Sequence, residues 1–230
     1  MSITVDNSLP RRSSDGGASI TSDTFNAVTN DLILACGNLD QNGLAFVVPT
    51  ISNNGAALTW TNIANIGASN SGTVCAWFTI LASDRSGLTV TLTRGNTNAD
   101  SPSIKIYLLQ GHDSADVLGA ITNNTSNTNN LTTASITPET SGVGFGIGTD
   151  WDQLGLPTSS DLTESGFDTP GDISGLAGFK DLTAGVAATA NMDAAGGLSA
   201  AWRYVWFEIR AAVVAVTGIP GVTIAPYRAA

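Results

Sequence analysis

The stretch TVCAWFTIL at residues 73–81 determines the fold class of this chain. Side chains of a β-strand point alternately to its two faces. One face of this stretch carries Val74, Ala76, Phe78 and Ile80, and the other carries Cys75, Trp77, Thr79 and Leu81. Both faces are mostly apolar, which predicts a central strand that is covered on both sides.

The same alternation extends outward from this strand. Leu88, Val90 and Leu92 alternate with threonines, which predicts a strand with one wet face. In residues 103–109 we expect Ile104, Ile106 and Leu108 to point inward, opposite Lys105 and Tyr107. In residues 201–210, Val205, Phe207 and Ile209 lie opposite Trp202, Tyr204, Trp206 and Glu208. Turn-forming residues bound further strands, expected at residues 18–25, 31–39, 57–66, 131–136, 143–149 and 176–182.

No window keeps a helical period for long, so the sequence predicts an all-β fold. We expect an antiparallel two-sheet, jelly-roll-like sandwich over residues 18–211, with an extended N-terminal arm (1–17) and a C-terminal tail (212–230). Residues 121–133 are too polar for a core and predict an exposed loop or an edge strand. Residues 150–172 are acidic and contain two prolines, which predicts an excursion over the surface.

Composition excludes several functions. The 230 residues include 19 acidic and 9 basic ones, for a formal charge of -10, so the surface repels phosphate backbones and nucleic acid is not an expected partner. No window is apolar enough to span a membrane, and the first residues lack the apolar run of a secretory signal. With no sign of export, we expect Cys36 and Cys75, both in apolar strands, to be buried reduced thiols.

The candidates for catalysis are weak, and we expect neither an enzyme nor a cofactor. The single histidine, His112, follows a strand without a nucleophile motif and reads as a turn residue. The glycines at every second position of residues 142–148 form one strand face, on which another backbone is expected to pack. A glycosidase carboxylate pair could lie among the acidic residues after position 150, but sequence gives no separation between them.

Two ligand hypotheses concern the same acidic segment. Asp150 and Asp152 resemble the first two oxygen ligands of a calcium loop, although the Gly and Glu of an EF-hand are missing, and solvated charge is the default interpretation. Trp151 is the one tryptophan of the five outside the alternating strands. It is our candidate for stacking on a sugar ring of a host-surface glycan.

The order of motifs resembles a known family. The segments TNDLILACGNL, AALTWTNIANI, GTVCAWFTILASDRSGLTVTLT, SIKIYLLQGHDSADVLGA and AAWRYVWFEIRA, between about Ile20 and Ala211, resemble a jelly-roll module of bacteriophage virion proteins. The resemblance implies a non-enzymatic structural protein located in the virion, a minor tail protein ahead of a capsid decoration protein. Its partners would be other virion proteins and copies of itself, and a carbohydrate-binding module is the further alternative.

The tail is the main candidate for a partner contact. The tail has one charged residue, Arg228, and is otherwise largely apolar. Its large apolar residues are Val213, Val214, Val216, Ile219, Val222 and Ile224. Left free, they would form an apolar patch of interface size. We expect the tail to pair with a neighbouring subunit or with an edge of its own sheet, and the arm and tail to be ordered by neighbours in an assembly.

Overall fold

A computed structural model describes residues 2–14, 16–40, 46–67, 72–95, 101–126, 131–150, 156–169, 173–192 and 202–213. These parts contain strands and turns but no helix, and every strand pair is antiparallel. The all-β prediction is therefore confirmed. The described segments contain no helix that is long and apolar enough to cross a membrane.

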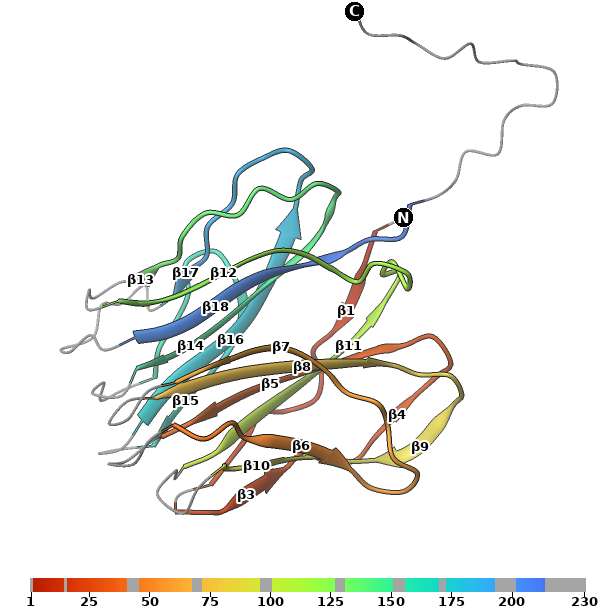
Figure 1. Cartoon of the computed structure of the whole chain (residues 1–230), viewed down its shortest axis with the longest axis vertical. Helices are drawn as coiled ribbons and strands as arrows, with labels where there is room; N and C mark the ends of the chain where they lie inside the picture. The colour runs from red at the N-terminus through yellow and green to blue at the C-terminus, as the bar shows by residue number, and fades with distance from the viewer. Residues whose placement is uncertain are drawn as a thin grey trace, which may run out of the picture.

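Two large sheets face each other (Figure 1). The six-stranded sheet has the order β1 (Thr4–Asp6), β11 (Ser103–Gln110), β5 (Leu32–Leu39), β8 (Thr73–Ile80) and β7 (Thr61–Ile66), and β2 (Arg12–Ser13) also pairs with β11. The five-stranded sheet has the order β12 (Leu118–Ser126), β18 (Trp202–Arg210), β14 (Gly142–Asp150), β16 (Ile173–Leu182) and β15 (Thr163–Thr169).

Smaller sheets cover the two outer faces. The six-stranded sheet is covered by the three-stranded sheet of β3 (Ser19–Thr21), β10 (Val90–Thr93) and β6 (Thr50–Asn53), and β4 (Phe25–Ala27) pairs with β9 (Arg85–Leu88). The pair β13 (Leu131–Thr132) and β17 (Asn191–Met192) lies against the five-stranded sheet. Both large sheets are thus buried on two faces, which explains why their strands are apolar on both sides.

The main core lies between the two large sheets. Tyr107, Phe145, Phe179 and Phe207 form its aromatic centre, with ring centroids 5.2 to 6.0 Å apart. The Tyr107 hydroxyl donates a 2.9 Å hydrogen bond to the Ala177 carbonyl of the opposite sheet. We predicted that Tyr107 and Lys105 would point away from the core; instead both are buried, Tyr107 in the main core between the two large sheets and Lys105 against carbonyls of the N-terminal arm.

Strand pairing within residues 4–110 is nested. The first strands pair with the last ones, β1 with β11, β3 with β10 and β4 with β9. All strands of the five-stranded sheet come from residues 118–210. The sandwich prediction holds, whereas the jelly-roll order stays a prediction.

The glycine face of β14 packs in part differently from our expectation. A Cβ placed on Gly144 would lie 2.2 Å from the Trp206 ring, and one on Gly148 would lie 2.7 Å from the Met192 sulfur. Side chains therefore fill the space above these two glycines, whereas a Cβ on Gly142 would lie 2.3 Å from the backbone oxygen of Ile209, as expected for a close backbone approach. The opposite face of β14, with Val143, Phe145 and Ile147, lies in the main core as predicted.

The N-terminal arm is held by its own chain. The buried Lys105 donates hydrogen bonds from Nζ to the carbonyls of Asn7 (2.6 Å) and Leu9. Arg11 reaches Asn38 Oδ1 (2.9 Å) and Ser103 Oγ (2.6 Å), and burial lowers the pKa of Arg11 to about 10. The arm therefore has anchors within its own chain, and an additional contact with neighbouring subunits stays a prediction.

Two other local predictions change. The region of residues 150–172 is not only a surface excursion, because β15 pairs with β16 along its length. The strand expected at residues 18–25 divides into β3 and β4, which belong to different small sheets. Most of the polar segment 121–133 that the structure describes belongs to β12, an edge strand, which was one of the two alternatives.

Candidate assembly surface

The edge strands β7 and β12 lie on the same side of the molecule. β7 is the last strand of the six-stranded sheet and β12 is the first of the five-stranded sheet. β18, the neighbour of β12, packs on β7 and β8. In Figure 1 both edges face the viewer, one above the other.

Neither of these edge strands carries the charged residues or prolines that protect many natural edges. Charged residues and prolines on an edge prevent another chain from pairing with it. β7 reads TNIANI and β12 reads LGAITNNTS, so neither contains a charge or a proline. On the opposite side, β1 contains Asp6, and the sequence of β15 contains Glu164 and Asp168. The side with β7 and β12 is therefore the one open to strand pairing.

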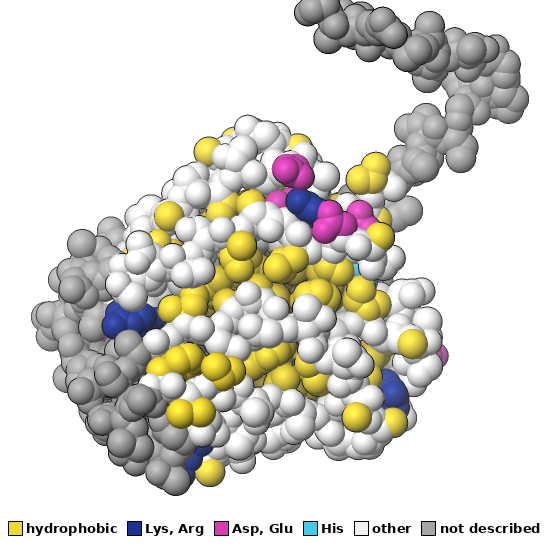
Figure 2. All heavy atoms as spheres, in the orientation of Figure 1, with side chains coloured by type: hydrophobic (Ala, Val, Ile, Leu, Met, Phe, Trp, Pro, Cys, Tyr) yellow, Lys and Arg dark blue, Asp and Glu magenta, His cyan; other side chains and the backbone are white. Residues whose placement is uncertain are grey.

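An apolar seam runs between these two edges. We define it as Ile63, Ile66, Phe78, Ile80 and Leu118, which are half-buried against the main core, together with Ile121. Ile121 is 42% exposed, and it pairs with the core residue Phe207, which places both side chains on the same face. Figure 2 shows a band of hydrophobic side chains between the two sheets on this face.

Both edge strands contain a bulge, and the two bulges leave different lengths of free edge. In β7 the bulge lies between Asn62 and Ala64, and the Asn62 amide donates hydrogen bonds to the carbonyls of Ala64 (3.3 Å) and Ala76 (3.2 Å). The Asn62 side chain therefore already bonds one of the backbone carbonyls of this short strand, that of Ala64.

The bulge of β12 lies between Leu118 and Ile121, at the beginning of the strand. It is held by the buried Glu208, whose Oε2 accepts a 3.1 Å hydrogen bond from the Ala120 amide. Gly119 is required here, because a Cβ at this position would lie 2.0 Å from Glu208 Oε2. From Ile121 to Ser126 the pairing with β18 is regular, so β12 offers the longer continuous edge.

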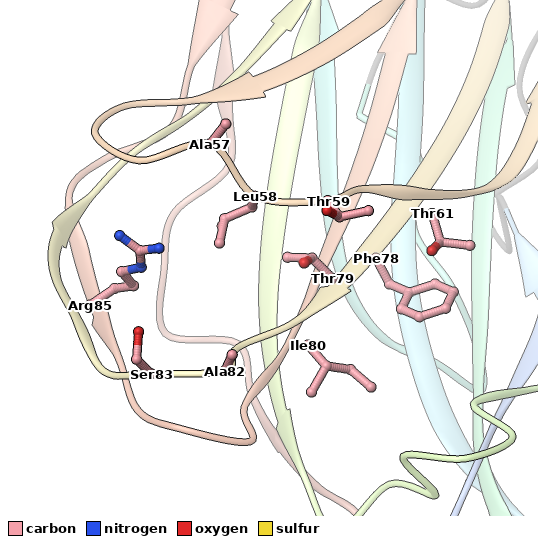
Figure 3. Close-up of a pocket in the computed structure, with 10 residues that line it drawn as sticks. All are labelled: Ala57, Leu58, Thr59, Thr61, Phe78, Thr79, Ile80, Ala82, Ser83 and Arg85. Atoms are coloured by element: carbon pink, nitrogen blue, oxygen red, sulfur yellow. The ribbon is translucent and has the colours of Figure 1, made fainter.

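A shallow pocket of about 360 Å³ continues the seam beyond the end of β8. Figure 3 shows Phe78 and Ile80 on one side of it and Ser83 and Arg85 on the other. Arg85 is the only charged residue among those that line the pocket, and the rest of the lining is apolar or hydroxylated. This lining can take an apolar side chain, but it contains no acid, base and nucleophile in the arrangement that catalysis needs.

The histidine considered as a catalytic candidate is not one of the residues of the seam or of the pocket. His112 follows β11 at the turn of Gly111 and forms an isolated bridge with Ala211. Burial is the main cause that lowers the pKa of His112 below its usual 6.5. Its backbone joins the end of β11 to the end of β18, in keeping with a turn residue.

The two thiols are free and buried, as predicted. Cys36 belongs to the main core, whereas Cys75 belongs to the core on the other side of the same sheet. Burial raises the pKa of Cys36 to about 12 and raises that of Cys75 well above its usual value. Both sites are therefore packing positions with unreactive thiols.

The calcium and glycan candidates are only partly described. Asp150 is fully buried at the end of β14, paired in register with Ser174 and Trp202, rather than in an open loop. Asp152 and Trp151 lie outside the described residues, so the calcium and glycan hypotheses stay predictions. Among the described residues, no group of three or more His, Cys, Asp or Glu side chains could hold a metal ion.

The apolar tail residues that we considered for a partner contact also lie partly outside the described residues. Val213 is described and is 71% exposed, whereas Val214, Val216, Ile219, Val222 and Ile224 lie outside the described residues. Sequence reasoning gave an edge strand as one alternative for the segment after Ile121, but it missed the edge at β7 and the seam between the two edges. The available signal was that both segments lack charged residues and prolines.

Comparisons with protein-family models, curated proteins and solved structures found no match to this chain. The case for its function therefore depends on the residues and geometry described above.

Proposed function

We propose that this chain is a non-enzymatic structural protein of a bacteriophage virion, and that it is a minor tail protein. The observation that carries the proposal is the pair of edges without charge or proline, β7 and β12, with an apolar seam between them. Such edges are a hazard for a protein that works alone, because they invite pairing with any other chain. They suit a protein whose edges are covered by a defined neighbour.

The rest of the molecule supports a rigid building block. Three hydrophobic cores are stacked through the sheets, so the scaffold that carries the edges is packed on both sides. A polar network fixes the two large sheets to each other: Asn38 on β5 donates hydrogen bonds to the Gly148 carbonyl (3.0 Å) and to Thr149 Oγ1 on β14. A rigid scaffold lowers the entropy cost of ordering the contact surface on assembly.

The location in a virion rests on the resemblance to phage jelly-roll modules. Within the virion, the tail is favoured over the capsid surface because the free edges lie on two different sheets. One molecule can then offer two neighbouring strand edges to the proteins beside it. A decoration protein needs only one face that fits an already formed lattice.

Immunogold microscopy tests the proposal. Antibodies against the purified chain are applied to intact phage particles whose genome encodes it, with antibodies against a known head protein as a positional control. The expected result is gold at the tail. Gold on the head would replace the tail assignment with capsid decoration, and absence of the chain from purified particles by mass spectrometry would refute the virion proposal.

A further inference from the structure

We propose that the free edge of β12 is a receptor for the apolar tail of a second copy of this chain, which adds to it as an antiparallel strand and covers the seam. This inference rests on the proposed structural role and names the partner of the assembly surface. The contact is heterologous, since the edge of one molecule takes up the tail of another.

The occupant is identified by its sequence and by its point of exit. The last backbone anchor of the described chain is a 2.8 Å hydrogen bond from the Ala212 amide to the Gly111 carbonyl, and Val213 beyond it is 71% exposed. The sequence continues as VAVTGIPGVTIA from residue 214 to residue 225. This segment is uncharged and rich in β-branched residues, like the strands that pair well with a sheet edge.

Alternation matches the tail to the seam. In an extended strand, Val214 and Val216 point to one face, and the same holds for Val222 and Ile224. On β12, Ile121 lies on the face of the main core, so a strand added beside it places every second side chain over the seam. Pro220 cannot donate to a ladder and limits how far the pairing extends.

The direction of the strands decides between the molecule's own tail and that of a second copy. β12 begins at Leu118, opposite Ile209, and ends at Ser126, opposite Trp202. The tail follows β18 and therefore leaves the molecule beside the beginning of β12. If it folded back along β12, it would run parallel to this strand.

Antiparallel addition requires a strand that enters from the other end, beside Ser126. Every described strand pair in the molecule is antiparallel, and antiparallel pairing is slightly more stable per residue than parallel pairing. Val214 and Val216 directly follow the exit point, so in their own molecule they cannot reach that end and then turn back. As an antiparallel strand on β12, Val214 and Val216 therefore come from a second copy.

A mixing experiment with full-length variants tests this contact. Ile121→Lys places a charge on the receptor edge and leaves the tail intact, whereas Val216→Pro removes a ladder donor from the tail and leaves the edge intact. Val28→Lys is the matched control, because Val28 is 49% exposed and lies away from the seam. Sedimentation velocity over about 1 to 100 μM measures the mass, starting from the 23.5 kDa monomer.

The expected result is a concentration-dependent association of the wild type and of Val28→Lys, at least tenfold weaker in either Ile121→Lys or Val216→Pro alone. An equimolar mixture of these two variants restores one contact and yields dimers but no larger species. A monomeric wild type, unchanged association of Ile121→Lys, or a mixture that stays monomeric would each overturn the inference. Circular dichroism checks the fold, and Asn123→Lys, at an exposed position on the same edge, replaces Ile121→Lys if that variant does not fold.

The two proposals fail separately. If the chain is present in the tail but Val216→Pro associates like the wild type, the virion proposal stands and the tail-to-edge contact is wrong. If the mixing experiment succeeds but the chain is absent from particles, the contact stands and the virion proposal is wrong.

Discussion

Adding one methyl group at Gly144 tests whether the tryptophan layer on the five-stranded sheet is as rigid as its contacts indicate. A Cβ at Gly144 would lie 2.2 Å from Trp206 Cη2 and 2.6 Å from Cζ2, so the ring has to move by about 1.2 Å to reach an ordinary contact of 3.4 Å. Trp206 is fully buried, and its Nε1 donates a 3.1 Å hydrogen bond to the Ala188 carbonyl. Moving the ring therefore weakens this bond.

The expected loss follows from three contributions. Overpacking a well-packed core costs about 1–3 kcal/mol, and the weakened hydrogen bond of Trp206 costs about 1 kcal/mol. Replacing a strand glycine by alanine returns about 0.5–1 kcal/mol, because glycine loses more backbone entropy on folding. We expect Gly144→Ala to lower the free energy of unfolding by about 2 kcal/mol, which for a chain of this size corresponds to about 4–8 °C in Tm.

Gly146→Ala is the matched control on the same strand and face. Its Cβ would meet Met192 Cε at 2.6 Å, the end of a flexible side chain that can rotate away. We expect its free energy of unfolding to lie within about 1 kcal/mol of the wild type, since the entropy gain offsets the local adjustment. Urea unfolding followed by tryptophan fluorescence measures all three proteins. Equal stabilities of Gly144→Ala and Gly146→Ala would refute the assignment of a locked Trp206 ring.

Three further predictions concern groups whose surroundings are defined by the structure. Since burial raises the pKa of Cys36 to about 12 and raises the pKa of Cys75 well above its usual value, Ellman's reagent at about pH 8 should modify neither thiol in the folded protein and both in urea; rapid modification without urea would contradict their burial. Because burial lowers the pKa of His112 below 6.5, the unfolded chain binds a proton more readily than the folded one. The free energy of unfolding should fall as the pH drops from about 6.5 towards the folded pKa, and urea titrations should show a smaller fall in His112→Gln. Arg11→Ala leaves Asn38 and Ser103 without a charged donor and should lower the free energy of unfolding, measured in urea, by about 2 kcal/mol. The control Arg12→Ala removes an exposed 3.4 Å ion pair with Asp23 and should lower it by less than about 1 kcal/mol. Equal losses would show that the arm is not anchored through Arg11.

Alternation predicted the central strands well because it reflects a local property of the backbone. The stretch from Thr73 to Ile80 is β8, and both of its faces are covered, as its two apolar faces indicated. The same reasoning failed for Lys105. A lysine in a strand usually marks a wet face, but here the carbonyls of Asn7 and Leu9 satisfy the ammonium inside the fold. The sequence does not show which distant backbone groups will meet a side chain.

Layering could not be predicted from the strands alone. Each strand's pattern gives the polarity of its faces but not the sheet that covers them. The glycine face of β14 illustrates this limit, because only the fold brings Trp206 and Met192 over Gly144, Gly146 and Gly148. The candidate surface was missed for a related reason: an open edge is a property of the sheet order, and sheet order depends on long-range pairing.

The absence of charge on the two open edges is, taken alone, a weak indication of function. Charged residues make up 12% of this chain, so the 6 residues of β7 and the 9 of β12 together would hold about two by chance. The coincidence with the seam is the stronger observation, because unpaired backbone groups and exposed apolar side chains such as Ile121 occur at the same place. A helix or a globular partner could cover the side chains, but only a strand can also pair the backbone groups of β12. A single β-strand with apolar residues at alternate positions meets both requirements, and the residues that follow Val213 have that pattern.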